Sequence, residues 1–169
     1  MRTSTFALVI GIVYLAVAVL GLVPALLMPP PADAPPTAFT VLYGYLIGLF
    51  PLNVLHTAVH FAIGVWGIAA GRGAASAKVY ARSLAILYGV LAVMGLIPGL
   101  NTVFGLVPLH GHDVWLHAAT AAIAAYFGWR KTTDLERRAA SERRQRMIPV
   151  ARERRLGATE RRQVSYNGA

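Results

Sequence analysis

The stretch FALVIGIVYLAVAVLGLVPALLM, residues 6–28, decides the fold of this chain. Its 23 residues include no Asp, Glu, Lys or Arg. An uncharged apolar helix of about 20 residues crosses the roughly 30 Å hydrocarbon core of a bilayer. The stretch also exceeds the roughly 7–15 apolar residues of a signal-peptide core. It therefore predicts a first membrane span that is retained in the protein.

The composition extends this interpretation to most of the chain. Of 169 residues, 56% are hydrophobic and 14% are charged, whereas soluble domains carry about 25% charged residues. The mean hydropathy is +0.55. The chain has no cysteine, which excludes a disulfide framework, a thiolate metal site and a cysteine nucleophile.

Three further stretches lack charged residues and predict three more spans. They cover residues 52–70, about 83–97, and 113–129, the last of which has Asp113 at its outer end and no other charged residue. Pro51 suits the start of the second span because proline cannot continue a helix from upstream. The sequence thus predicts an all-α bundle of four transmembrane helices in residues 1–131. One alternative is a single long kinked helix over residues 39–70.

Positive charge is confined to alternate connections. Lys and Arg number 16, and all of them fall on one side of the membrane if the four spans alternate. The positive-inside rule then places both termini in the cytoplasm. The chain is predicted to be a multi-pass protein of the plasma membrane, with the lipid bilayer as its first partner.

The chain also repeats itself. Three pairs of segments match, the third after a four-residue insertion: 14–26 with 88–100, 48–52 with 105–109, and Leu55-His56 with Leu116-His117. We expect two copies of a two-span unit, residues 6–71 and 80–130, related by a pseudo-twofold axis along the membrane normal. In this register His60 aligns with Ala121, which predicts an asymmetric arrangement of histidines.

The intramembrane histidines are the candidate functional residues. His56 and His60 are four residues apart, so they share one helical face, and His117 lies on the equivalent face of the fourth span. Three interpretations remain open. A transition metal would be held by His56, His60 and His117, with Asp113 or His112 completing the set. A b-type haem would take His56 or His60 and His117 as axial ligands. In the third interpretation the histidines only form hydrogen bonds within the bundle.

These interpretations lead to three classes of function. The first is a membrane protein with a structural or interaction role, the second a metal- or haem-binding protein, and the third a small transporter or channel. The chain lacks a P-loop, a dinucleotide fingerprint and a His-Glu-x-x-His motif, so the sequence favours a non-enzymatic role. In the outer loop, Asp113 is expected to cap the fourth helix from a solvated position.

Residues 132–169 form an arginine-rich tail. They include 10 Arg and 5 acidic residues and few apolar ones, which predicts a largely disordered cytoplasmic segment. Its charge favours contact with anionic lipid. Nucleic acid is not predicted as a partner, because Tyr166 is the only aromatic side chain available for stacking. A bundle this small is also a candidate for homo-oligomerisation.

The motif Asn53-x-x-His56-x-x-x-His60, followed later by Asp113-x-x-x-His117, resembles a bacterial family of small four-helix membrane proteins known only as a domain of unknown function. The resemblance covers residues 6–130. It implies the four-span fold and a bacterial plasma-membrane location, and it implies no activity.

The predicted topology can be tested with reporter fusions. A reporter fused after residue 35 is expected to report the outer side, and a reporter fused after residue 169 the cytoplasm. Matched alkaline phosphatase and fluorescent protein fusions at both positions provide the control for expression. A cytoplasmic signal at residue 35 would overturn the topology.

Overall fold

The structure is a computed structural model that describes residues 1–131 and, in the C-terminal segment, residues 141, 142 and 145. The chain divides into two compact units, Met1–Arg130 and Lys131–Ala169. The predictions made for the tail, residues 132–169, concern a segment that lies almost entirely outside the described residues.

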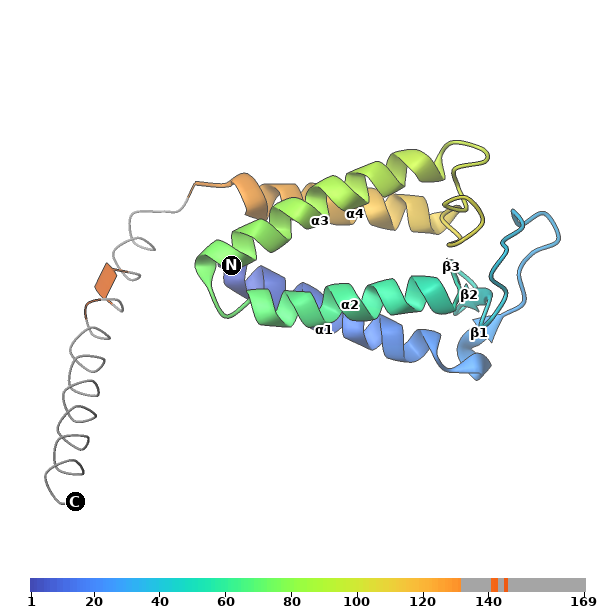
Figure 1. The fold of residues 1–169 in the computed structure, drawn as a ribbon, viewed down its shortest axis with the longest axis horizontal. Helices are drawn as coiled ribbons and strands as arrows, with labels where there is room; N and C mark the ends of the chain where they lie inside the picture. Colours follow the sequence, from blue (N-terminus) through green and yellow to red (C-terminus); the bar gives the residue numbers. More distant parts are fainter. Residues whose placement is uncertain (132–140, 143–144, 146–169) are drawn as a thin grey trace, which may run out of the picture. The chain divides into compact units, whose positions relative to one another are not determined.

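Four α-helices make up most of the first unit (Figure 1). They are α1 (Thr3–Gly21), α2 (Val54–Ala70), α3 (Ala74–Gly95) and α4 (His112–Trp129). Helix α1 packs along α2, and α3 packs along α4, so the unit consists of two helical hairpins. The predicted all-α class is confirmed. Among the described residues, α1 and α3 are long and apolar enough to cross a membrane, judged by length and composition.

Two helix boundaries differ from the uncharged stretches of the sequence. Helix α1 ends at Gly21 instead of residue 28, because Pro24 opens a short 3-10 turn, η1 (Pro24–Leu26). Helix α3 begins at Ala74, well before residue 83. A charged residue ends an uncharged stretch of sequence, but the helix can continue through that residue. Arg82 lies within α3, and its Nε donates a hydrogen bond to the Gly128 carbonyl at 3.0 Å.

A small antiparallel sheet covers the end of the unit where α2 and α4 begin. It contains β1 (Leu27–Met28), β2 (Gly44–Leu46) and β3 (Phe50–Leu52), in that order. The sequence interpretation did not predict this sheet, and the alternative of one helix over residues 39–70 is wrong. Ile47 and Gly48 have φ values of 50° and 76°. Left-handed residues of this kind form the tight turns of β-hairpins.

The buried face of α1 recurs on α3. All seven buried positions of α1 have a buried equivalent 74 residues later: Thr3 and Ala77, Phe6 and Tyr80, Ala7 and Ala81, Gly11 and Ala85, Tyr14 and Tyr88, Ala18 and Ala92, Gly21 and Gly95. Identical residues stand at four of these pairs. The two helices therefore present the same surface to the interior.

Residues 42–71 have equivalents 57 positions later, with no insertion. A Cβ on Gly71 would lie 3.2 Å from Leu8, and a Cβ on Gly128 would lie 3.0 Å from Arg82, the equivalent of Leu8. The four-residue insertion expected from the sequence is therefore not seen in the packing. Four residues make about one helical turn, so both alignments keep the same face. We call this pairing of residues the hairpin correspondence. Residues of α1 and α3 are paired 74 positions apart, and residues 42–71 and 99–128 are paired 57 positions apart.

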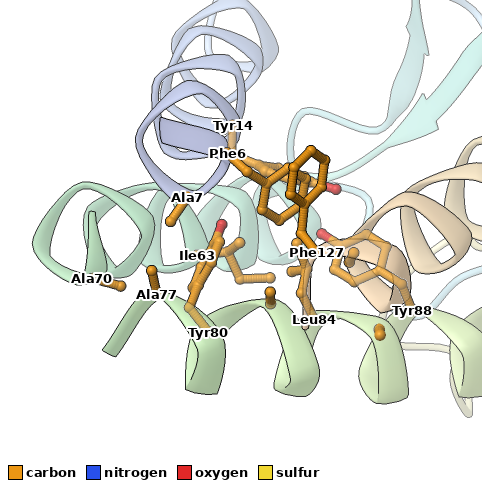
Figure 2. Packing of buried hydrophobic residues seen from close by; sticks show 13 residues of the cluster. Phe6, Ala7, Tyr14, Ile63, Ala70, Ala77, Tyr80, Leu84, Tyr88 and Phe127 are labelled. Carbon is orange, nitrogen blue, oxygen red and sulfur yellow. The ribbon is translucent and has the colours of Figure 1, made fainter. Parts of the chain in front are cut away.

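The interior has an apolar half and a polar half. The Phe6 and Phe127 rings stack with centroids 4.6 Å apart, and Figure 2 shows these rings with Tyr80 and Leu84. Buried histidines and Asp113 lie toward the sheet-covered end. The exterior is apolar at both ends of the helices, because large apolar side chains are exposed along all four of them.

Contact between α1 and α2 depends on glycine. A Cβ on Gly11 would lie 2.7 Å from the Ile68 nitrogen and 2.8 Å from the Gly64 oxygen. Because both are backbone atoms, Gly11→Ala must push the helices apart. We expect a loss of about 1–3 kcal/mol of stability, typical of overpacking, measured as a lower Tm in detergent.

Gly89 provides the matched control for this prediction. It lies within α3, and nothing is found within 4 Å of a Cβ placed there. Gly89→Ala should leave the Tm unchanged or raise it, since alanine favours helix. Equal Tm values for the two variants would contradict the close packing at Gly11.

Candidate functional site

Asn53 fixes the start of α2 under the sheet. Its side chain is completely buried. Its Oδ1 accepts a hydrogen bond from the His56 backbone N–H at 2.9 Å, which caps the helix. Its Nδ2 donates to the carbonyl oxygens of Phe39 at 3.1 Å and Leu106 at 2.8 Å. One side chain thus joins the first turn of α2 to the loops of both hairpins.

Asp113 lies inside α4 and does not cap it. The capping position is Gly111, with φ of 65° and no side-chain hydrogen bond, and Asp113 is the second helical residue. The expected solvated position is also wrong, because Asp113 is only 2% exposed. The sequence contains no Lys or Arg between Arg82 and Arg130. The positive end of the α4 dipole is therefore the nearest fixed source of favourable potential.

His117 lies one turn after Asp113 and contacts it twice. Its Nδ1 is 2.7 Å from the Asp113 carbonyl oxygen and 3.3 Å from the carboxylate Oδ2. We assign the single Nδ1 proton to the shorter contact, which leaves Oδ2 without a hydrogen bond in the described residues. In this tautomer Nε2 carries a lone pair, as in histidines that ligate metals.

His56, Asp113 and His117 converge at one point. Each offers one ligand atom, and these atoms all lie within 4.8 Å of one another. All three residues are at least 97% buried. Within the described part of the chain, His56 Nδ1 and Asp113 Oδ2 have no hydrogen-bond partner. Buried polar atoms without partners are costly, so this cluster is suited to holding a cation.

The other predicted site residues lie outside this group. His60 is buried one turn deeper, with its ring centroid 4.4 Å from that of His56. His112 is exposed at the first position of α4. His110, which was not among the predicted ligands, is buried in the loop before α4, with its Nδ1 3.4 Å from the Tyr45 hydroxyl. Burial lowers the pKa of His110, and the negative charge of Asp113 opposes that shift.

Two tyrosines, Tyr14 and Tyr88, complete the surroundings, and they were not among the predicted site residues. Five rings from the four helices form a closed circuit of neighbours. The centroid distances are His56–His60 4.4 Å, His60–Tyr14 5.1 Å, Tyr14–Tyr88 5.7 Å, Tyr88–His117 4.7 Å and His117–His56 6.1 Å. The signal for this feature was the recurrence of tyrosine at matching positions of the repeat.

The donor set defines the chemistry that the cluster can support. Two imidazoles and one carboxylate suit first-row transition ions such as zinc or iron. An isolated buried carboxylate is strongly unfavourable, and a bound cation removes that cost. The contact between His117 Nδ1 and the Asp113 carbonyl also orients the ring, as outer hydrogen bonds do in metal centres.

Comparison with known proteins identifies a family and no function. Residues 4–130 match the family described as Domain of unknown function (DUF4383). No curated protein and no solved structure matches the chain.

Replacing Asn53 tests its role at the start of α2. Asn53→Ala removes three hydrogen bonds and leaves buried partners unsatisfied, so we expect a loss of roughly 2–4 kcal/mol of stability. The measurement is thermal unfolding of purified protein in detergent. Asn101→Ala is the control, because the hydrogen bonds of Asn101 in the structure are made by its backbone, with the Ile97 carbonyl and the Leu109 N–H, and alanine retains them. Similar unfolding of both variants would contradict the role of Asn53.

Proposed function

The chain belongs to the DUF4383 family, and we propose that its domain is a four-span integral membrane protein that holds a transition-metal ion between its two hairpins. The observation that carries the metal proposal is the convergence of His56, Asp113 and His117 within 4.8 Å.

The distribution of polarity supports a membrane location. Apolar side chains face outward on all four helices, while histidine, aspartate and asparagine are buried inside. A water-soluble bundle has the opposite arrangement, and monomeric soluble proteins rarely expose such large apolar surfaces. Helices α2 and α4, with 17 and 18 residues, fall at the short end of the range for spanning helices.

The charges support one orientation. Arg2, Arg72, Lys78 and Arg130 lie at or near the start of α1, the end of α2, the start of α3 and the end of α4. These four termini share one end of the unit (Figure 1). The positive-inside rule assigns that end to the cytoplasm, in a bacterial plasma membrane. The metal cluster then lies toward the outer face.

The hairpin correspondence supports a tandem repeat. Residues 6–71 and 80–130 are two copies of one two-helix unit, related by a pseudo-twofold axis along the membrane normal. The recurrence of buried positions on α1 and α3 supports this proposal. So do the left-handed residues Ile47 and Phe104, which stand 57 positions apart.

A small ion suits the cluster better than a haem. The Asp113 carboxylate lies within 4.8 Å of the ligand atoms of both His56 and His117. A bis-histidine haem would have no use for this third ligand atom so close to the other two, whereas a metal ion would. A metal ion uses that oxygen as a ligand, because carboxylates and imidazoles together bind divalent ions.

The other predicted functions find less support in the described residues. Histidines with a purely structural role should have their hydrogen bonds satisfied, yet His56 Nδ1 and His60 Nδ1 lack partners there. A transport path needs polar groups across the membrane. Between His60 and the end of the unit opposite the sheet, the interior is filled by Phe6, Leu84 and Phe127. Lipid contact by the tail and self-association remain predictions, and no enzymatic activity is assigned.

Metal analysis tests the proposed function. Protein purified without a histidine tag in mild detergent is expected to contain a stoichiometric transition metal and no Soret band. Asp113→Asn and His117→Ala should each abolish most of the metal content, because each removes a ligand.

His112→Ala is the matched control, since His112 is exposed and lies beside the cluster in sequence. Its metal content should equal that of the unmodified protein. A folded protein that is metal-free after purification and after dialysis against zinc, iron or manganese would overturn the proposal.

A further inference from the structure

The hairpin correspondence places His60 in a role equivalent to that of His117. In the 57-residue offset, His60 corresponds to His117, and His56 corresponds to Asp113. Each hairpin therefore contributes two polar side chains one helical turn apart, at the same height in the bundle. The sequence alignment with an insertion had paired His60 with Ala121 and concealed this relation.

Packing around the two residues supports the correspondence. His60 contacts Tyr14 with ring centroids 5.1 Å apart, and His117 contacts Tyr88 at 4.7 Å. Tyr14 and Tyr88 are themselves equivalent, and they meet each other at 5.7 Å. Each histidine thus packs against a tyrosine of its own hairpin, and the two tyrosines are equivalent.

Glycine contacts at the same end of the unit agree with this relation. A Cβ on Gly21 would meet Thr57 at 2.7 Å and Leu52 at 3.3 Å. A Cβ on Gly95 would meet Val114 at 2.7 Å and the oxygen of Leu109 at 2.7 Å. Val114 and Leu109 are the equivalents of Thr57 and Leu52, so the starts of α2 and α4 are placed in the same way.

Replacing each residue of the metal cluster by its equivalent in the other hairpin gives a second set of possible ligands. The cluster of His56, Asp113 and His117 becomes Asp113, His56 and His60. The two sets share His56 and Asp113 and differ only in the outer histidine. The described atoms reflect this, because the buried side-chain atoms without partners include one from each residue of the second set: His56 Nδ1, His60 Nδ1 and Asp113 Oδ2.

We propose that His60 is the fourth protein ligand of the metal ion, so that the ion is bound by three imidazoles and one carboxylate. This inference rests on the proposed function. The His60 ring already neighbours that of His56, with centroids 4.4 Å apart, and the proposal requires the His60 side chain to turn toward the ion. One ion then satisfies every unpartnered atom of the set. Four protein ligands make a closed, structural site of the zinc type, in which no position is left for substrate.

Cobalt(II) is the probe for the ligand count, because four-coordinate cobalt absorbs visible light more strongly than five- or six-coordinate cobalt. The full-length protein in detergent, loaded with Co²⁺, is expected to show the strong tetrahedral bands. His60→Ala replaces an imidazole with water, so its bands should shift even where the cobalt stays four-coordinate. Its affinity should fall by at least the roughly 10- to 100-fold seen when outer-shell partners are lost.

His110→Ala is the matched control, because His110 is also a buried histidine but lies in the loop and contacts Tyr45. It should retain the bands and the affinity. Bands that shift and affinity that falls in His60→Ala, with both unchanged in His110→Ala, support the inference. If His60→Ala binds Co²⁺ with unchanged spectrum and affinity, the inference is overturned and the proposed metal site stands.

X-ray absorption of the unmodified protein keeps the inference testable if the His60 variant does not fold. Three imidazoles and one oxygen donor around zinc support it, and two imidazoles with additional water oxygens overturn it. If the unmodified protein binds no metal, both this inference and the proposed function are overturned. A metal bound by only two imidazoles overturns this inference alone, so the two failures can be distinguished.

Discussion

The contact between Asp113 and His117 is the interaction on which the arrangement of the interior depends. A carboxylate buried between helices must receive positive potential from its surroundings. Here it receives that potential from the first turn of α4, since no Lys or Arg occurs between Arg82 and Arg130. Near the starts of α2 and α4, ligand atoms of His56, Asp113 and His117 lie within 4.8 Å of one another.

The loops reinforce this arrangement in a reciprocal way. Asn53 and His110 are equivalent in the hairpin correspondence. Asn53, in the first hairpin, donates to the Leu106 carbonyl in the loop of the second. His110, in the second hairpin, lies against Tyr45 in the sheet strand of the first. Each half therefore reaches into the other at the sheet-covered end, where the ligand residues begin.

Much of the helical part of the fold could be predicted from the sequence. Uncharged apolar stretches locate four helices because the interior and the exterior both select apolar residues. Their ends are predicted less well, since Pro24 stops α1 early and Arg82 continues α3. The sheet was missed because β1, β2 and β3 have two or three residues each, too few for an alternating pattern.

The candidate site was predicted in part. Helical spacing placed the residues of the His56 and His117 faces inside, and the structure brings their ligand atoms together with Asp113. Sequence similarity alone could not fix the register, because shifting α4 by four residues matches histidine to histidine and leaves the face unchanged. The contacts of Gly71 and Gly128 distinguish the two alignments. These contacts depend on how the helices pack against each other, and residue types alone do not reveal them.

Residues 71–73 join the two hairpins between α2 and α3, and this short link has a consequence for the chemistry of the interior. Two separate identical hairpins would have to carry the same side chain at equivalent positions. They would offer either four neutral imidazoles or two carboxylates that repel each other at close range. Within one polypeptide the two halves are free to differ. Histidine at 56 and aspartate at 113 give the centre a single negative charge, which neither symmetric assembly can supply.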